Sequence, residues 1–352
     1  MTNLKVAVLG GGSFGTVLAN ISAANKHQTT IWMRDQDQVA SINNTHRNSK
    51  YISDLQLADD LVATSDLSVA LENSQIIILA LPSKAFPNVV ERMMPHLTNQ
   101  YLISATKGIA EDKFMLMSEL LVSALKRYGL DPSNRIGVLS GPNIAKEIAA
   151  KHLTGSVIAS TNKDLNLMVR QTLSTKYLHI FDNEDIYGVE LAGSLKNIYA
   201  IAAGISDSLG FGINTKSVLI SRSISEMVRF ASCMNAKKMT FTGLASIGDL
   251  IATCSSVDSR NYRLGKNLIG GDTIEEICAR LGGVAEGIHT TKMTYQKAQE
   301  LNISMPLLEG VYRIIFNREK VKNVLWKVLV NTPYEDVEHV NIGDIESQSN
   351  KS

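Results

Sequence analysis

The chain has 352 residues, of which 44% are hydrophobic and 20% are charged, with a formal net charge of +1. This length suffices for two domains with sizeable cores, and the composition is typical of a soluble globular protein. The near-zero charge gives no indication of binding to nucleic acid or to an anionic membrane, and we expect neither as a partner. The three cysteines are far apart and form neither a disulfide framework nor a zinc pattern, so we expect a reducing cytoplasm and no metal site. We expect no membrane span, because no apolar run approaches ~18 residues, and no signal peptide, because the amino terminus leads straight into an apolar strand.

The first predicted element is a buried parallel strand over residues 4–9, which runs into a glycine-rich turn at residues 10–15 and then a helix. A strand, a Gly-x-Gly-x-x-Gly turn and a helix in this order are the fingerprint of a dinucleotide site. We expect Gly10 to permit the tight turn, Gly12 to let the pyrophosphate approach, and Gly15 to let helix and strand pack closely. The alternative is an ordinary glycine turn.

A second predicted strand, residues 29–33, ends at Arg34 and Asp35. An acidic residue in this place holds the ribose of NAD, whereas an arginine accommodates the extra phosphate of NADP. Because Arg34 precedes Asp35, the sequence favours NADP without excluding NAD, and Arg47 could contribute. The alternative is that Arg34 is only a surface residue at a strand end.

The alternation of strands and helices continues to about residue 181. The expected strands cover 75–81, 101–104, 135–139, 154–160 and 176–181, and the expected helices cover 114–128, 144–150 and 165–173. Because ligands bind at the carboxyl ends of such strands, we expect Ser13, Lys107, Gly141 and Asn143 to converge on one crevice. Lys107 could instead be a solvated lysine or cap a helix.

Beyond about Asp185 the patterns are helical. The expected helices cover 185–209, 215–234, 243–253, 260–269, 273–281, 288–301, 306–316 and 321–330. This change predicts an α/β Rossmann-like domain with a parallel sheet over 1–184 and an all-helical domain over 185–333. The polar residues 334–352 show no periodicity, and we expect a disordered tail.

The first helix of the second part carries one cation, Lys196, among small and apolar residues. Val189, Gly193 and Ala200 share its helical face, so the ammonium has little side-chain bulk around it. Burial would lower the pKa of this lysine and let it exchange a proton near neutral pH. A solvated lysine, or one that snorkels out of a packed helix, is the more common case for a single lysine.

Two later motifs also suggest a site. Asp249, in a run of small and apolar residues, could orient a lysine ammonium, accept a substrate hydroxyl, or cap the helix that follows. Ser259, Arg260 and Asn261 combine a capping hydroxyl, a helix N-terminus and a guanidinium, all of which favour an anion such as phosphate. The alternative for these three residues is a capped surface helix.

Taken together, these residues resemble the bacterial-type NAD(P)-dependent glycerol-3-phosphate dehydrogenases over about residues 5–330. The resemblance is carried by residues 10–16, 105–108, 140–147, 188–204, 248–250, 259–261 and 284–287. It implies a Rossmann domain followed by an all-helical substrate domain, often in a homodimer. It also implies hydride transfer between NADPH or NADH and C2 of dihydroxyacetone phosphate, which supplies sn-glycerol 3-phosphate for phospholipid synthesis.

The resemblance assigns roles by position, with Lys196 as the proton acceptor and donor at C2. The implied substrate contacts are Lys107, Gly141, Asn143, Lys196, Asp249, Ser259, Arg260 and Asn261. The implied cofactor contacts are Ser13, Phe14, Arg34, Lys107, Ala145, Arg260, Val284 and Glu286. They add to Gly10, Gly12 and Gly15, which the glycine-rich turn already predicts as cofactor contacts. Asn143 stands where the family often has serine or threonine, and all three can form hydrogen bonds.

The chemistry expected from the residues agrees with this assignment. Reduction of a phosphorylated ketone needs a hydride source, a proton donor and a phosphate anchor, and the glycine turn, Lys196 and Arg260 supply them. Two other functions stay open: a related dehydrogenase acting on a 3-hydroxy acid or a sugar acid, and a non-catalytic nicotinamide sensor. Activity with dihydroxyacetone phosphate but not with hydroxy acids would separate the first of these from the main hypothesis.

Overall fold

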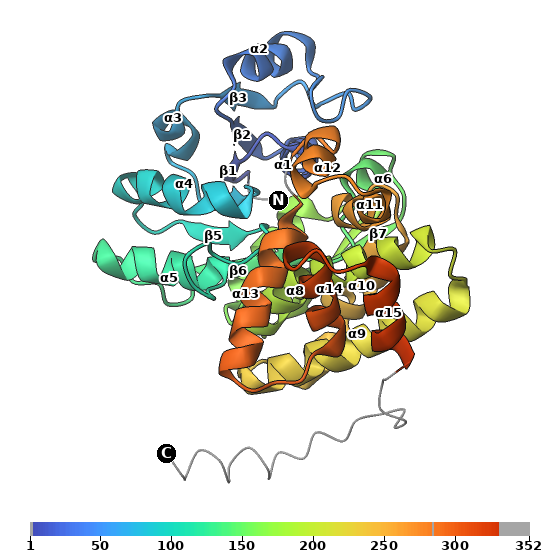
Figure 1. Cartoon of the computed structure of the whole chain (residues 1–352). Helices are drawn as coiled ribbons and strands as arrows, with labels where there is room; N and C mark the ends of the chain where they lie inside the picture. The colour runs from blue at the N-terminus through green and yellow to red at the C-terminus, as the bar shows by residue number, and fades with distance from the viewer. Residues whose placement is uncertain (1–2, 284, 331–352) are drawn as a thin grey trace, which may run out of the picture.

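A computed structural model describes residues 3–283 and 285–330 and shows an eight-stranded sheet followed by a helical part (Figure 1). The strands are β1 (Lys5–Leu9), β2 (Gln28–Trp32), β3 (Val62–Thr64), β4 (Ile76–Leu79), β5 (Tyr101–Ser104), β6 (Ile136–Ser140), β7 (Thr154–Ala159) and β8 (Leu178–Asn183). Among the described residues no strand follows β8. The predicted α/β class is therefore confirmed.

The strand order is β3-β2-β1-β4-β5-β6-β7-β8. Because β1 lies between β2 and β4, the chain order reverses there, and the carboxyl ends of β1 and β4 flank the crevice where such sheets bind ligands. The sheet is parallel as predicted except at one pair, since β7 pairs antiparallel with β6. The connection between them holds only the short helix α6 (Ala145–Ala149) and reverses the chain instead of crossing the sheet.

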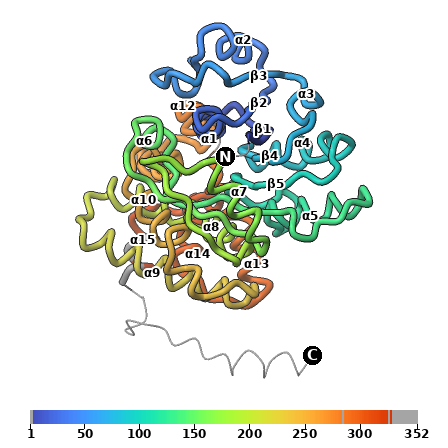
Figure 2. Tube along the Cα trace, turned by 180° about the vertical axis from the view of Figure 1, so that it is seen from behind, coloured from blue at the N-terminus to red at the C-terminus, as the bar shows by residue number. Residues whose placement is uncertain are grey.

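Helices cover both faces of the sheet (Figure 1, Figure 2). Alternate residues of the central strands enter two separate cores: Val6 and Val8 of β1 face one, and Ala7 and Leu9 face the other. This is why the buried strands read as continuous apolar runs. The remaining helices of this part are α1 (Ser13–Ala24), α2 (Gln36–Thr45), α3 (Leu67–Leu71), α4 (Phe86–Met93), α5 (Met117–Arg127) and α7 (Lys163–Leu173).

The helical part is organised around α8 (Ile186–Ser208), which is buried on all sides from Gly188 to Ser206. A helix that is small and apolar all round suits this central position. Gly204 of α8 and Gly265 let two helices touch, because a Cβ at either would collide with the other helix's backbone. The later helices are α9 (Ile213–Cys233), α10 (Asp249–Ser255), α11 (Arg260–Asn267), α12 (Ile274–Arg280), α13 (Glu286–Glu300), α14 (Pro306–Phe316) and α15 (Val321–Val330).

The junction of the two parts lies between β8 and α8. Asp185 caps α8 by accepting from the backbone N–H of Gly188 at 2.9 Å, and it also accepts from the Thr240 hydroxyl at 2.6 Å. The predicted domain division at 184/185 falls at this cap and stays a prediction, and the predicted tail lies outside the described residues. Within the described ranges, no helix has the length and apolar character needed to cross a bilayer.

Candidate active site

The glycine turn after β1 has the geometry of a phosphate cradle. Gly10 has φ of +126°, and a Cβ there would collide with the carbonyl of Ala80. A Cβ at Gly15 would collide with the carbonyl of Gly10, so both glycines have the steric roles expected of them. At Gly12 a Cβ would meet nothing within 4 Å, and no side chain caps α1. The turn thus leaves open space and free backbone N–H groups, which fits the pyrophosphate of a dinucleotide.

Asp35 and Arg34, the two residues expected near the cofactor ribose, differ in their contacts. Asp35 caps α2, because its Oδ1 accepts from the N–H groups of Asp37 and Gln38 at 3.1 and 3.3 Å. Its Oδ2 pairs with Nζ of Lys50 at 2.8 Å, and this bond lowers the pKa of Asp35. Arg34 is exposed. The carboxylate that could hold a ribose is therefore already engaged, whereas the neighbouring guanidinium faces solution.

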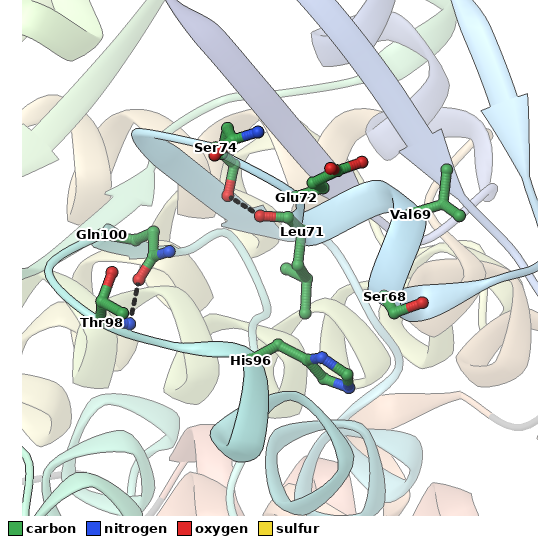
Figure 3. Close-up of a pocket in the computed structure, with 9 residues that line it drawn as sticks. Ser68, Val69, Leu71, Glu72, Ser74, His96, Thr98 and Gln100 are labelled. Carbon is green, nitrogen blue, oxygen red and sulfur yellow. Dashed lines mark hydrogen bonds between the residues drawn. The ribbon is translucent and has the colours of Figure 1, made fainter.

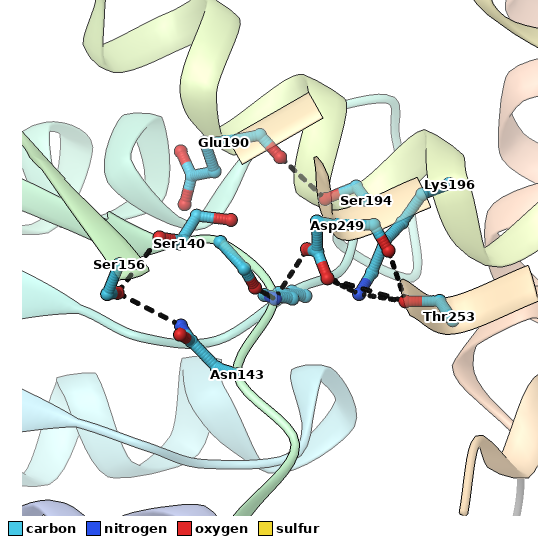
Figure 4. Close-up of polar contacts among 10 residues, drawn as sticks. Ser140, Asn143, Ser156, Glu190, Ser194, Lys196, Asp249 and Thr253 are labelled. Atoms are coloured by element: carbon cyan, nitrogen blue, oxygen red, sulfur yellow. Dashed lines mark hydrogen bonds and ion pairs between the residues drawn. The ribbon is translucent and has the colours of Figure 1, made fainter. Parts of the chain in front are cut away.

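Asp249 is only 1% exposed, and its carboxylate pairs with two lysines, of which Figure 4 shows Lys196. Its Oδ1 forms an ion pair with Nζ of Lys196, and its Oδ2 pairs with Nζ of Lys107 at 2.6 Å. Lys196 also donates to Oγ1 of Thr253 at 2.6 Å, and Thr253 in turn donates to the Asp249 carbonyl at 2.6 Å. Asp249 is thus the carboxylate that orients the ammonium of Lys196, and the helix-capping alternative is wrong, since the N-cap of α10 is Gly248.

The environment of Lys196 changes its acidity. The residue is 6% exposed, so the alternative of a solvated or snorkelling lysine is wrong. Burial lowers the pKa of Lys196 to about 7; the charge of Asp249 opposes this shift and that of Lys107 adds to it. The sequence suggested an isolated cation, but the structure places a second ammonium beside it. A group with this pKa can donate or accept a proton near neutral pH.

The loop after β6 supports Lys107. The Gly141 carbonyl accepts from Nζ of Lys107 at 2.7 Å, which excludes both the solvated and the helix-capping alternatives for this lysine. Ser156 donates its single hydroxyl proton to the Ser140 carbonyl at 3.0 Å, so it can only accept from Nδ2 of Asn143, at 3.1 Å. These bonds fix the amide of Asn143, whose Oδ1 is buried and has no partner among the described residues.

The start of α11 has the cap that the sequence predicts. Oγ of Ser259 accepts from the backbone N–H of Tyr262 at 3.2 Å. Asn261 is buried and accepts from the N–H of Gly287 at 2.9 Å, which ties α11 to the start of α13. Arg260 is exposed beside Gly283. The guanidinium and the helix N-terminus thus remain available to an anion.

The other predicted cofactor residues are not joined in one hydrogen-bond network in the part of the chain that the structure describes. Glu286 accepts from the backbone N–H of Ser83 at 3.1 Å and from its hydroxyl, which joins α13 to the loop after β4. Ser13 donates to the Tyr51 carbonyl at 3.1 Å. Phe14 packs on a sheet core, Ala145 begins α6, and Val284 lies outside the described residues.

Several residues that bond in this region, Thr253, Ser83 and Lys50, are not among the predicted site residues. Thr253 lies one turn after Asp249 on the same helix, a spacing that could have identified it. Ser83 contacts Glu286, 203 residues away, and Lys50 contacts Asp35, 15 residues away. Nothing in their own neighbourhoods in the sequence indicates these contacts.

A separate surface pocket of about 550 Å³ lies at the opposite, amino-terminal ends of β4 and β5 (Figure 3). Polar groups there bond to each other: Ser74 donates to the Leu71 carbonyl at 2.9 Å, and Gln100 accepts from the N–H of Thr98 at 2.7 Å. None of the predicted site residues lines it.

A glycine cradle at the switch point of the sheet and a buried lysine of lowered pKa beyond it define the class of protein, a nicotinamide-dependent oxidoreductase. Residues 5–166 match the family model of the NAD-dependent glycerol-3-phosphate dehydrogenase N-terminus, and residues 185–326 match the model of its C-terminus. The chain belongs to the NAD-dependent glycerol-3-phosphate dehydrogenase family, so the predicted resemblance is confirmed.

Individual relatives agree over nearly the full length. The chain is 44% identical to the glycerol-3-phosphate dehydrogenase (NAD(P)+) of Teredinibacter turnerae, over 96% of this chain and 98% of the relative. It is also 44% identical to the protein of that name from Pseudomonas syringae pv. tomato, over 97% and 98%. The crystal structure of glycerol-3-phosphate dehydrogenase from Coxiella burnetii is 34% identical, with a TM-score of 0.86, and the match covers 93% of this chain and 99% of that one.

Proposed function

We propose that the chain interconverts dihydroxyacetone phosphate and sn-glycerol 3-phosphate with NADPH or NADH, and that Lys196 transfers the proton at the C2 oxygen. The observation that supports this most directly is the buried Lys196–Asp249 pair, in a chain that matches the family in both halves. The product would serve phospholipid synthesis. The activity is tested by following the oxidation of NADPH and NADH with dihydroxyacetone phosphate. The alternative activities are tested by following the reduction of NADP+ and NAD+ with 3-hydroxy acids and sugar acids.

In the proposed mechanism, the bound dihydronicotinamide supplies the hydride, and the side chains supply the proton and the orientation. The Lys196 ammonium donates its proton to the oxygen that becomes negative as C2 is reduced. Asp249 and Thr253 hold Nζ of Lys196 in place, so the proton donor is oriented before the substrate arrives. Lys107 and the free Oδ1 of Asn143 offer a positive charge and a hydrogen-bond acceptor to the substrate.

We place the substrate phosphate at the start of α11. The capped helix end offers backbone N–H groups, and Arg260 offers a guanidinium that can contact two phosphate oxygens. Binding energy from this remote group can orient the carbonyl for hydride transfer. A hydroxy-acid substrate has no phosphate that would use these groups.

Replacing Arg260 by alanine is expected to lower kcat/KM for dihydroxyacetone phosphate by about tenfold or more, because a charge-assisted contact is lost. The control substrate is dihydroxyacetone, which has no phosphate. Wild type should use it poorly, and Arg260→Ala hardly worse. Equal damage with both substrates would mean that Arg260 serves the cofactor or the fold instead.

For the cofactor, the engaged carboxylate of Asp35 and the exposed Arg34 together favour NADPH. Arg34→Ala is expected to raise KM for NADPH more than KM for NADH, because only NADPH carries the extra phosphate. Steady-state KM values for the two cofactors, measured side by side, check this. The same increase for both would show that Arg34 does not contact that phosphate.

We further propose that the enzyme is a cytoplasmic homodimer with no nucleic-acid partner. The support is the family membership and the net charge of +1. The oligomeric state is tested by sedimentation at several protein concentrations.

A further inference from the structure

Lys107 lies in a segment, residues 105–117, that connects the end of β5 to the start of α5 and contains no long helix or strand. A short bridge joins Ile109 to Leu116 within it. The proposed site needs the Lys107 ammonium at a fixed distance from that of Lys196, because both pair with Asp249. The contacts that hold this segment therefore affect the geometry of the site.

Both ends of the segment are bonded to one side chain, Glu190 of α8. At the β5 end, the hydroxyl of Ser104 donates to Oε1 of Glu190 at 3.3 Å. At the α5 end, the backbone N–H of Ser118 donates to both carboxylate oxygens at 3.1 Å, and the Ser118 hydroxyl donates to Oε2. Glu190 is 2% exposed, so these hydrogen bonds take the place of water around its carboxylate. One carboxylate thus joins two points separated by the whole segment.

The same face of α8 contacts the middle of the segment. Oγ of Ser194 lies 3.2 Å from the Gly108 carbonyl and 3.0 Å from the carbonyl of Glu190, so its single proton is shared between the segment and α8 itself. A Cβ at Gly193 would lie too close to Oγ of Ser140, at 2.6 Å, but at an ordinary contact distance of 3.6 Å from Cγ of Lys107, so the stem of Lys107 packs beside this point of α8. Glu190, Gly193 and Lys196 recur at intervals of three residues, so they lie on neighbouring parts of the helix surface. Figure 4 shows Glu190 and Lys196 on this helix.

We propose that Glu190 is a positioning residue, which sets the separation of the Lys107 and Lys196 ammonium groups by holding both ends of residues 105–117 against α8. This inference rests on the proposed roles of the two lysines. Glu190 touches neither of them in the described structure, so it acts through the segment. Two other contacts also hold the segment: Oγ1 of Thr106 donates to the Leu81 carbonyl at 2.8 Å, and Nε2 of His289 lies 3.0 Å from the Ala110 carbonyl.

The chain offers a matched control in Glu226 of α9. It is 3% exposed, and it caps α14 by accepting from the N–H groups of Leu307 and Leu308, at 2.6 and 3.1 Å. Burial raises the pKa of both glutamates to about 7. Glu226 has no bond to residues 105–117 among the described contacts. A purely structural cost of replacing a buried capping glutamate should therefore appear equally in both variants.

The experiment compares Glu190→Gln and Glu226→Gln in kcat, KM for dihydroxyacetone phosphate, and Tm. We expect kcat/KM to fall by about tenfold or more in Glu190→Gln, because glutamine has one acceptor oxygen in place of the two that bond to Ser104 and Ser118, and to stay within about twofold in Glu226→Gln. In a Lys107→Met background, Glu190→Gln should cost less than about a further twofold, since its effect acts through Lys107.

Two results would overturn the inference: equal losses in the two glutamine variants, or losses from Glu190→Gln and Lys107→Met that multiply. If Glu190→Gln does not fold, Ser118→Ala removes a single bond to the carboxylate. It should show a smaller loss that also disappears in the Lys107→Met background. Wild-type enzyme inactive with dihydroxyacetone phosphate would refute the proposed function instead, so the two failures are distinguishable.

Discussion

Replacing Lys196 by methionine is expected to lower kcat by about 10²–10⁴-fold, the range for loss of a general acid. Methionine keeps an unbranched side chain of similar length in this buried position but has no proton to donate. The fold and the affinity for NADPH should be retained. Steady-state kcat at saturating substrates, together with Tm and a cofactor titration, measures these quantities.

The pH dependence gives the control for this prediction. In the reduction direction the ammonium form of Lys196 is the acid, so kcat/KM should be level below pH about 7 and fall above it. In the oxidation direction the neutral amine is the base, and the rate should rise as pH increases through the same value. Lys196→Met should lose both dependences. A variant with near-wild-type kcat, or with an unchanged pH profile, would exclude Lys196 as the proton donor.

The sequence predicted strands and long helices at the observed residues where burial alone determines the pattern of apolar residues. The glycine turn, the buried strand β5 and helices α14 and α15 appear at the predicted residues, because apolar runs and periodic stripes reflect burial directly. No helix or strand was predicted between β2 and β4. There α2 is largely polar and β3 has three residues, so neither carries a readable period.

The direction of β7 was also not predictable. Buried strands are apolar whether their neighbour is parallel or antiparallel, so β7 gives the same pattern in either case. Only the connection through α6 decides it, and a short helix can serve a reversal or a crossover.

At the site, the sequence indicated the right kinds of residue but not how they pair. Lys107 and Lys196 each have a local motif, yet both contact Asp249, and these contacts join positions 142 and 53 residues apart. Three-dimensional pairing over such distances leaves no periodic trace. The same is true of Glu190, which is part of the apolar stretch of α8 in the sequence and bonds to Ser118, 72 residues away.

The other large effect is expected for Asp249→Asn. This carboxylate has a side chain 2% exposed and is shared by two ammonium groups, so its loss leaves two cations without their common partner. Breaking a buried pair by removing one side costs about 3–5 kcal/mol, and the free energy of unfolding should fall by an amount of that order. Denaturant unfolding measures this directly.

The catalytic consequence of Asp249→Asn follows from the sign of its effect on Lys196. The Asp249 charge raises the pKa of Lys196 against the effect of burial, so removing it should lower that pKa further below 7. At pH 7 less ammonium would remain, kcat/KM for reduction should fall by about 10²-fold or more, and part of the loss should be recovered at lower pH. Thr253→Val is the matched control, because it removes a neutral bond to the same Nζ and should leave the pH profile nearly in place. If Asp249→Asn kept the wild-type pH profile, the ion pair would not set the acidity of Lys196, and the role proposed for Asp249 would have to be abandoned.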